Sequence, residues 1–212
     1  MATTDWQGLI FLIIGWTAYF GIHSILASSQ VKEWVSTNMP ILKPWYRLGF
    51  NAVALGGFML LLGYQQTIPT AALWDGSGWS QVVGAATIAV AALLAWRAMR
   101  YYDLGSFVGW RQQESRTIDP PEALATEGLN AHVRHPLYTA TVLLLIGWIF
   151  WSPSLVTLIV VALAGIYLRI GIYFEEIKLV NTYGAAYERY QQEVPMLFPR
   201  LSRDGKKGMR NR

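Results

Sequence analysis

Long stretches without a charged side chain dominate the pattern of the chain. They cover residues 6–31, 48–74, 76–96 and 136–168. Each of these stretches can cross a bilayer, because a spanning helix needs about 20 mostly apolar residues. As a single helix the last stretch would be roughly 50 Å long, well beyond a hydrocarbon core of about 30 Å. We therefore expect it to fold back on itself.

The break in this last stretch lies at the Ser-Pro-Ser sequence of residues 152–154. Proline removes a helical hydrogen bond and clashes with the preceding turn, so a helix ends there. We expect a hairpin with one arm over 136–151 and the other over 155–174. Together with the three earlier stretches this gives about five spans.

A second pattern follows the hairpin. Apolar and aromatic residues recur every three or four positions from Ile177 to Val194 and stop at Pro195, which predicts an amphipathic helix. The predicted fold class is all-α: a polytopic membrane helix bundle with a helical hairpin (136–174) and a cytosolic amphipathic C-terminal helix.

The composition supports a membrane protein built as one domain. Hydrophobic residues make up 53% of the 212 and charged residues only 14%, which is unlike a soluble domain of this size. No repeat or long linker divides the chain. We expect one domain over 1–212, with three spans in 1–100, a polar loop, the hairpin and the C-terminal helix in 101–200, and a basic tail in 201–212.

The distribution of charge predicts the orientation. With five spans, all 17 Lys and Arg residues fall on one side of the bilayer, whereas the other side carries only Asp5 and Asp75. Short cytoplasmic loops collect basic residues. We therefore expect an integral membrane protein of the bacterial inner membrane, with its N-terminus outside and its C-terminus cytoplasmic. No basic residue precedes Lys32, so we expect the first span to be retained rather than cleaved.

The charge and the cysteine content of the chain limit which partners it can bind and which kinds of site it can form. The net charge of +4 comes from residues beside the membrane, where anionic headgroups explain it, so we expect membrane lipids and no nucleic acid as partners. The absence of cysteine excludes disulfides, thiolate catalysis and Cys-ligated zinc, and we assign no metal site. Gly56, Gly57 and Gly63 would allow close helix contact, but we assign no oligomeric state.

The start of the hairpin carries the first candidate site. Pro136 fits the first position of a helix, which places His135 at the cap and Arg134 just outside it. A positive helix end flanked by Arg and His attracts an anion such as a carboxylate or phosphate. The alternative is that Arg134 is one more cytoplasmic anchor and His135 an ordinary cap, and spacing alone favours that alternative.

The far end of the hairpin carries the second candidate site. Glu175 and Glu176 are adjacent carboxylates at a membrane boundary, where ionisable groups tend to be paired and functional. One of them is expected to pair with Arg169 or a neighbouring basic residue; the alternative is a simple interfacial charge pair. His23 and Ser24, near the inner end of the first span, are expected to face the bundle, where a lone histidine is more often a core residue than a ligand.

Taken in order, these segments resemble the isoprenylcysteine carboxyl methyltransferase superfamily of membrane methyltransferases. That superfamily includes phospholipid N-methyltransferases and, in bacteria, methanethiol S-methyltransferases and NnrU-like proteins. Residues 23–27 and 109–112 are similar to its bacterial small-substrate branch. The other residues that carry the resemblance lie in the last ninety or so positions: Thr126, Glu127, Gly128, Leu129, Val133, Arg134, His135, Pro136, Leu137, Tyr138, Glu175, Glu176, Leu179, Tyr183, Gly184, Tyr187, Tyr190, Val194 and Pro195.

The resemblance implies an enzyme that transfers a methyl group from S-adenosyl-L-methionine to a small lipophilic or membrane-embedded acceptor, which is a thiol, carboxylate or amine. The cofactor would lie in a cytosolic pocket with a lateral tunnel to the membrane. The cofactor-binding residues it implies are Gly128, Leu129, His132, His135, Pro136, Tyr138, Glu175 and Glu176. The catalytic residues it implies are Arg134, Arg169 and Glu175.

Two alternatives stay open at this stage. Sterol reductases share a similar C-terminal pattern but use NADPH, and their chains are far longer. An NnrU-like accessory protein that handles haem and has no enzymatic activity is suggested by His23, His132 and His135. The chain also departs from the prenylcysteine enzymes, in which an arginine lies closer to the paired glutamates than Arg169 does here.

Overall fold

The computed structural model describes residues 5–100 and 124–200, and most of these residues are helical. They form no β-strand, only an isolated bridge between Ala72 and Ser154. Short 3-10 turns cover Lys43–Trp45 and Gly128–Ala131. The α-helices are α1 (Trp6–Ala27), α2 (Ser29–Asn38), α3 (Tyr46–Gln65), α4 (Trp79–Met99), α7 (Pro136–Trp151), α8 (Leu155–Tyr183) and α9 (Ala185–Glu193).

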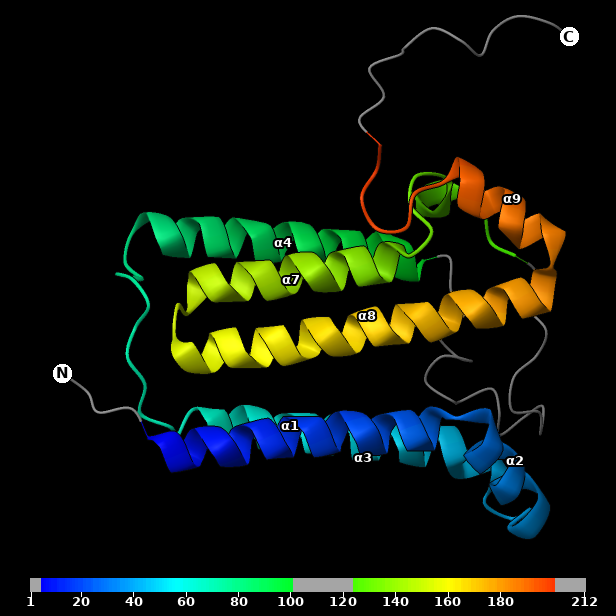
Figure 1. The fold of residues 1–212 in the computed structure, drawn as a ribbon, viewed down its shortest axis with the longest axis horizontal. Helices are drawn as coiled ribbons and strands as arrows, with labels where there is room; N and C mark the ends of the chain where they lie inside the picture. Colours follow the sequence, from blue (N-terminus) through cyan, green and yellow to red (C-terminus); the bar gives the residue numbers. More distant parts are fainter. Residues whose placement is uncertain (1–4, 101–123, 201–212) are drawn as a thin grey trace, which may run out of the picture.

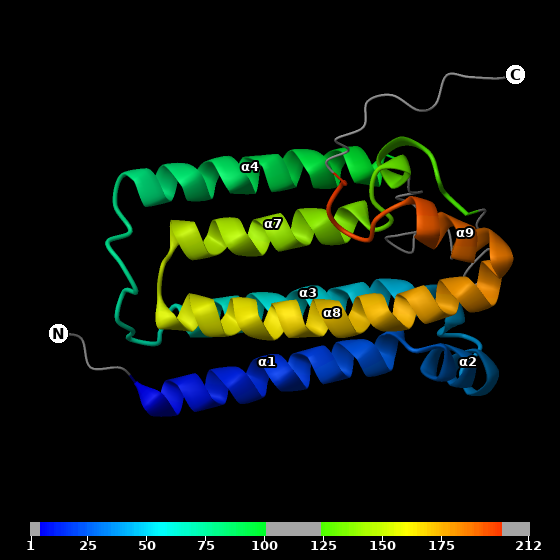
Figure 2. The same ribbon diagram turned by 45° about the horizontal axis from the view of Figure 1, so that its top comes forward.

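Five of these helices run side by side along the long axis of the molecule (Figure 1). Helix α4 lies against α7, and α8 lies between α7 and α1 in both views (Figure 2). Helices α1, α3, α4 and α8 are long and apolar enough to cross a membrane, and α7 is a shorter apolar helix. This confirms the predicted all-α polytopic membrane bundle.

The first arm of the hairpin and the start of the second have the boundaries that the sequence predicts. Helix α7 begins at Pro136 and ends at Trp151. Helix α8 begins at Leu155, where the hydroxyl of Ser154 caps it by accepting a hydrogen bond from the backbone N–H of Thr157 at 3.1 Å. A Ser cap satisfies one of the free N–H groups of a first turn, so this tripeptide both ends one arm and starts the other.

The end of α8 corrects the sequence analysis. The expected division into a span ending near residue 174 and a separate helix from Ile177 is wrong, because α8 continues without a break to Tyr183. Gly184 then adopts a φ of 55°, a left-handed conformation that suits glycine. The chain turns at this residue, and α9 starts at Ala185.

The length of α8 places its C-terminal turns outside the bilayer. The helix has 29 residues, which corresponds to about 43 Å, whereas the hydrocarbon core is about 30 Å thick. Between Leu155 and Phe174 the only charged residue is Arg169. We take this part as the membrane-spanning segment. The turns from Glu175 onward therefore project beyond it, next to α9.

The first span also ends earlier than its uncharged stretch. Helix α1 stops at Ala27, and the Ser28 side chain accepts a hydrogen bond from the backbone N–H of Val31 at 3.3 Å, which starts α2. Helix α2 was not expected from the pattern. It lies at the same end of the bundle as α9 (Figure 1).

The closest helix contact joins α4 and α7. A Cβ atom at Gly84 would lie 2.6 Å from the backbone nitrogen of Trp151 and 2.9 Å from the carbonyl oxygen of Gly147. Glycines at such a crossing let two backbones approach each other. Of the expected glycines, Gly56 and Gly63 have open space around them within this chain, and a Cβ atom at Gly57 would lie 3.0 Å from the ring of Tyr19 on α1.

We predict that Gly84→Ala destabilises the bundle by about 1–3 kcal/mol, because the added methyl group meets backbone atoms that cannot rotate away. The matched control is Gly165→Ala in α8, where no heavy atom lies within 4 Å of the added Cβ. Unfolding in mixed detergent micelles measures both variants. Equal stability of the two variants would contradict the close crossing.

Candidate functional site

Two segments that lie far apart in the sequence meet at one carboxylate, that of Glu176 on α8. Arg134 binds it through two parallel hydrogen bonds, Nε to Oε1 at 3.0 Å and Nη2 to Oε2 at 2.8 Å. The Arg134 Nη1 group also donates to the backbone carbonyls of Gln191 at 3.1 Å and Val194 at 2.6 Å. Four of the five N–H groups of a guanidinium are therefore used by the chain itself.

Three further side chains donate to the same carboxylate. The Nε2 atom of His135 lies 2.5 Å from Oε1 of Glu176, and the hydroxyl of Tyr187 donates to that oxygen at 2.8 Å. The side-chain amide of Gln191 donates to Oε2 at 2.7 Å. Because a carboxylate only accepts hydrogen bonds, Nε2 of His135 carries the proton.

This arrangement keeps Glu176 ionised. The side chain is only 12% exposed, and burial alone would raise its pKa. Hydrogen bonds from Arg134, Tyr187, His135 and Gln191 outweigh burial and lower the pKa of Glu176 to about 2. Burial, with the carboxylate of Glu176 beside it, raises the pKa of Tyr187, so the phenol stays a donor.

The segment after α9 closes over the start of α7. The backbone N–H groups of Arg134 and His135 donate to the carbonyls of Pro195 at 2.9 Å and Met196 at 3.1 Å. The hydroxyl of Thr139 donates to the carbonyl of Leu197 at 2.6 Å. We call residues 194–197 the C-terminal clasp, because they hold the loop and the hairpin together through backbone atoms.

Helix α9 also holds the turn that precedes the hairpin. Gly128 has a φ of 63° and opens the 3-10 turn Gly128–Ala131. The side chain of Asn130 is buried and donates to the carbonyl of Ala125 at 3.0 Å. The buried hydroxyl of Tyr190 on α9 donates to the carbonyl of Asn130 at 2.6 Å. Helix α9 therefore fixes both the turn and the Glu176 carboxylate.

The neighbouring carboxylate, that of Glu175, differs from Glu176 in its exposure and its hydrogen bonding. Its side chain is 39% exposed, yet its Oε2 atom is buried and has no hydrogen-bond partner among the described residues. This oxygen lies 3.9 Å from Nδ1 of His135. The Oε2 atom of Glu175, an acceptor without a partner, therefore leaves a place for a donor.

The structure brings most of the expected site residues together. Arg134, His135, Glu175 and Glu176 form one cluster, which we call the Glu176 cluster. Pro136 is buried at the first position of α7 directly after it. Further expected residues follow the same turn: the ring of Tyr138 lies 5.5 Å from that of His135, while Leu129 is half-buried and Gly128 is exposed in the 3-10 turn.

Other expected residues lie apart from the cluster. Arg169 is exposed, and no hydrogen bond or ion pair joins it to any residue in the described part of the chain. Of the two glutamates, Glu176 pairs with Arg134 and not with Arg169. His132 is also exposed. Residues 109–112, which carried part of the resemblance, lie outside the described residues.

Some members of the cluster were not expected from the sequence. Tyr187 stood out as part of an aromatic stripe and of the family resemblance, without a role in the site, and its spacing of eleven residues from Glu176 became meaningful only because the chain turns at Gly184. Gln191 gave no signal. In residues 5–100 and 124–200, no group of three or more His, Asp or Glu side chains is placed to hold a metal ion.

We predict that Arg134→Gln destabilises the folded protein by about 3–5 kcal/mol, because it leaves the buried Glu176 carboxylate without its charge partner. Arg169→Gln is the matched control and should change stability by no more than about 0.5 kcal/mol. Chemical unfolding in mixed micelles compares them. Similar losses of stability in the two variants would show that the ion pair between Arg134 and Glu176 does not stabilise this end of the bundle.

The pKa of Glu176 predicts a pH dependence. Its pKa is depressed from an ordinary value of 4.5 to about 2, so its stabilising contribution is complete above 4.5 and is lost as the pH falls towards 2. We expect the stability difference between wild type and Glu176→Gln to be constant from about pH 7 to pH 5 and to shrink below that. Thermal unfolding in detergent across this pH range measures the stability difference. A stability difference that does not change with pH would contradict the lowered pKa of Glu176.

Comparison with known proteins identifies the family. The phospholipid methyltransferase family matches residues 79–186, about half of the chain. A protein named methanethiol S-methyltransferase from Crocosphaera subtropica is 28% identical over 205 residues, covering 90% of this chain and 74% of the relative. Methanethiol S-methyltransferase 2 of Bradyrhizobium diazoefficiens is 30% identical over 187 residues, covering 84% and 68%.

Methanethiol S-methyltransferase 1 of the same organism is 26% identical over 184 residues, and the chain covers 62% of its length. No solved structure matches the chain. The family match includes the hairpin and both glutamates of the site, and it confirms the resemblance found from the sequence. The chain belongs to the phospholipid methyltransferase family and is a membrane methyltransferase.

Proposed function

We propose that the protein transfers a methyl group from S-adenosyl-L-methionine to a small lipophilic thiol. The family supports methyl transfer, and relatives named for methanethiol favour a thiol over a carboxylate or an amine as the acceptor. One observation carries the site: the buried, unpartnered Oε2 of Glu175 lies 3.9 Å from Nδ1 of His135, beside the hydrogen-bonded carboxylate of Glu176.

The residues at this place fit the cofactor. The unpartnered oxygen of Glu175 is an acceptor, which suits the ammonium or ribose hydroxyl groups of S-adenosyl-L-methionine and the positive charge that this molecule carries. When bound, the cofactor supplies an electrophilic methyl group on a sulfonium. Glu175 and His135 would bind its donor groups, with the turn at Gly128 and Leu129 beside them.

Within this proposal Arg134 and Glu176 act as positioning residues. Their paired hydrogen bonds fix the imidazole of His135 and therefore the direction in which Nδ1 points. Arg169 lies seven residues before Glu176 on α8, which places it on nearly the same helix face and about 10 Å nearer the membrane. Its exposed guanidinium would stabilise the acceptor sulfur as that atom becomes anionic.

The reaction needs few catalytic groups. With Glu175 and His135 holding it, the cofactor would supply the methyl group and keep the electron pair of the broken bond on its own sulfur. The acceptor thiol would bind the methyl carbon through its sulfur and release its proton to water. The contribution of the protein is to align the two sulfur atoms and exclude water, which a rigid site at a membrane boundary can provide.

We also infer that the Glu176 cluster faces the cytoplasm. Basic residues lie at this side of the bundle in or next to four elements: Lys32 in α2, Arg47 at the start of α3, Arg97 and Arg100 at the end of α4, and Arg134 before α7. Basic residues mark the cytoplasmic side. The cofactor would then reach the site from the cytoplasm, and the lipophilic acceptor from the bilayer.

A turnover assay tests the function. Purified protein in detergent is mixed with S-adenosyl-L-methionine and methanethiol, and dimethyl sulfide in the headspace and S-adenosylhomocysteine in solution are measured. We expect both products in equal amounts. A folded protein that forms neither product, with methanethiol or with longer alkyl thiols, would contradict the proposal.

A binding assay tests the site separately. We predict that Glu175→Gln weakens binding of S-adenosylhomocysteine about tenfold to a hundredfold in calorimetric titration, because a hydrogen bond to a charged group is lost. Glu188→Gln, the same change at an exposed position of α9, is the control and should bind like wild type. Equal affinities for both variants would remove Glu175 from the site.

A further inference from the structure

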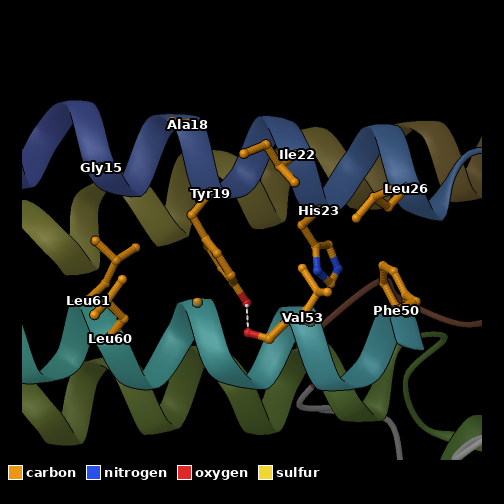
Figure 3. Close-up of a pocket in the computed structure, with 12 residues that line it drawn as sticks. Gly15, Ala18, Tyr19, Ile22, His23, Leu26, Phe50, Val53, Leu60 and Leu61 are labelled. Carbon is orange, nitrogen blue, oxygen red and sulfur yellow. Dashed lines mark hydrogen bonds between the residues drawn. The ribbon is translucent and has the colours of Figure 1, made fainter. Parts of the chain in front are cut away.

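A second hollow lies within the membrane part of the bundle, between α1 and α3 (Figure 3). Its volume is about 300 Å³, at the small end of the range for ligand pockets. On the α1 side it extends from Gly15 to Leu26, and on the α3 side from Phe50 to Leu61. We call it the α1–α3 pocket.

The wall of this pocket is apolar apart from two side chains. The hydroxyl of Tyr19 crosses to α3 and donates to the carbonyl of Ala54 at 3.1 Å, so it is already satisfied (Figure 3). His23 points from α1 towards α3, where its ring lies 4.9 Å from that of Phe50. Its Nδ1 atom is buried and has no hydrogen-bond partner within the described ranges.

The chemistry of the wall defines what it can hold. A buried polar group without a partner is costly, and an imidazole in apolar surroundings offers one acceptor to a donor. An acyl chain has no donor and leaves this cost in place. The residues that line the pocket include no Asp, Glu, Lys or Arg, so an ion would lie there without a counterion.

We propose that the α1–α3 pocket binds a small neutral lipophilic molecule with a single X–H donor, which donates a hydrogen bond to the imidazole of His23. Nothing in the Glu176 cluster requires this site. Small thiols belong to the class it selects, so the pocket would hold the acceptor within the bilayer before transfer; this last step rests on the proposed function.

The position of the pocket agrees with such a role. Ser24, the residue after His23, donates to the hydroxyl of Tyr167 on α8 at 3.1 Å. Tyr167 precedes Arg169 by two residues. The His23 end of the pocket therefore lies at the level of the α8 turn that carries Arg169, although residues two apart on a helix face different sides.

The test is a binding measurement that does not depend on turnover. The probe is 4-fluorobenzyl mercaptan, followed by fluorine NMR with the protein in lipid nanodiscs, against empty nanodiscs to subtract partitioning. Its methyl thioether has the same apolar body but no donor. We expect wild type to bind the thiol about threefold to tenfold more tightly than the thioether.

Two variants separate the shape of the pocket from its hydrogen bond. Ala54→Leu fills the pocket and should abolish binding of both probes, whereas Ala52→Leu, the same change on an exposed face of α3 outside the pocket, should bind like wild type. His23→Phe keeps a ring of similar size and should bind thiol and thioether equally. Binding to Ala54→Leu at wild-type strength, or no preference for the thiol in wild type, would overturn the proposal.

The possible results separate a failure of the α1–α3 pocket proposal from a failure of the proposed function. Thiol binding that Ala54→Leu abolishes, in a protein that forms no dimethyl sulfide, would support the pocket and contradict the function. Dimethyl sulfide formation in a protein whose thiol binding is the same in Ala54→Leu and Ala52→Leu would overturn the pocket and leave the function standing.

Discussion

The buried carboxylate of Glu176 is the constraint on which this end of the molecule depends. A charge that is removed from water must be matched by donors and by an opposite charge. Here the donors come from the loop before α7 and from α9, so neither element can be placed independently of α8. The same requirement explains why Arg134, a residue suited to binding an outside anion, is occupied by the chain itself. The site is rigid because satisfying one group fixes several segments at once.

The thickness of the membrane determines where along α8 an ionised carboxylate can lie. Helix α8 is longer than the hydrocarbon core, so its last turns reach an aqueous boundary where a carboxylate can be ionised. Below that boundary the bundle is held differently, by the glycine crossing of α4 and α7 and by apolar packing of Leu12 and Trp16 on α1 against Val160 on α8. The two parts use different interactions, and the length of α8 connects them.

Much of the architecture could be predicted from the sequence because it depends on local rules. Span lengths, the Ser-Pro-Ser break and Pro136 at the start of α7 are read from composition and from the properties of proline. The extent of α8 could not be, because a helix that leaves the bilayer has no local reason to stop at a charged residue. The pairing of Glu176 with Arg134 rather than Arg169 was also hidden, since it depends on where Gly184 turns the chain.

The C-terminal clasp has a consequence for the order in which the protein is made. Pro195, Met196 and Leu197 complete the contacts of the loop through carbonyl groups, and they leave the ribosome after the α7–α8 hairpin. Until then Arg134 lacks the carbonyl acceptors of Gln191 and Val194, and Glu176 lacks two of its donors. Membrane insertion of the α7–α8 hairpin and completion of the Glu176 cluster are therefore successive events, and the second waits until the C-terminal clasp has left the ribosome.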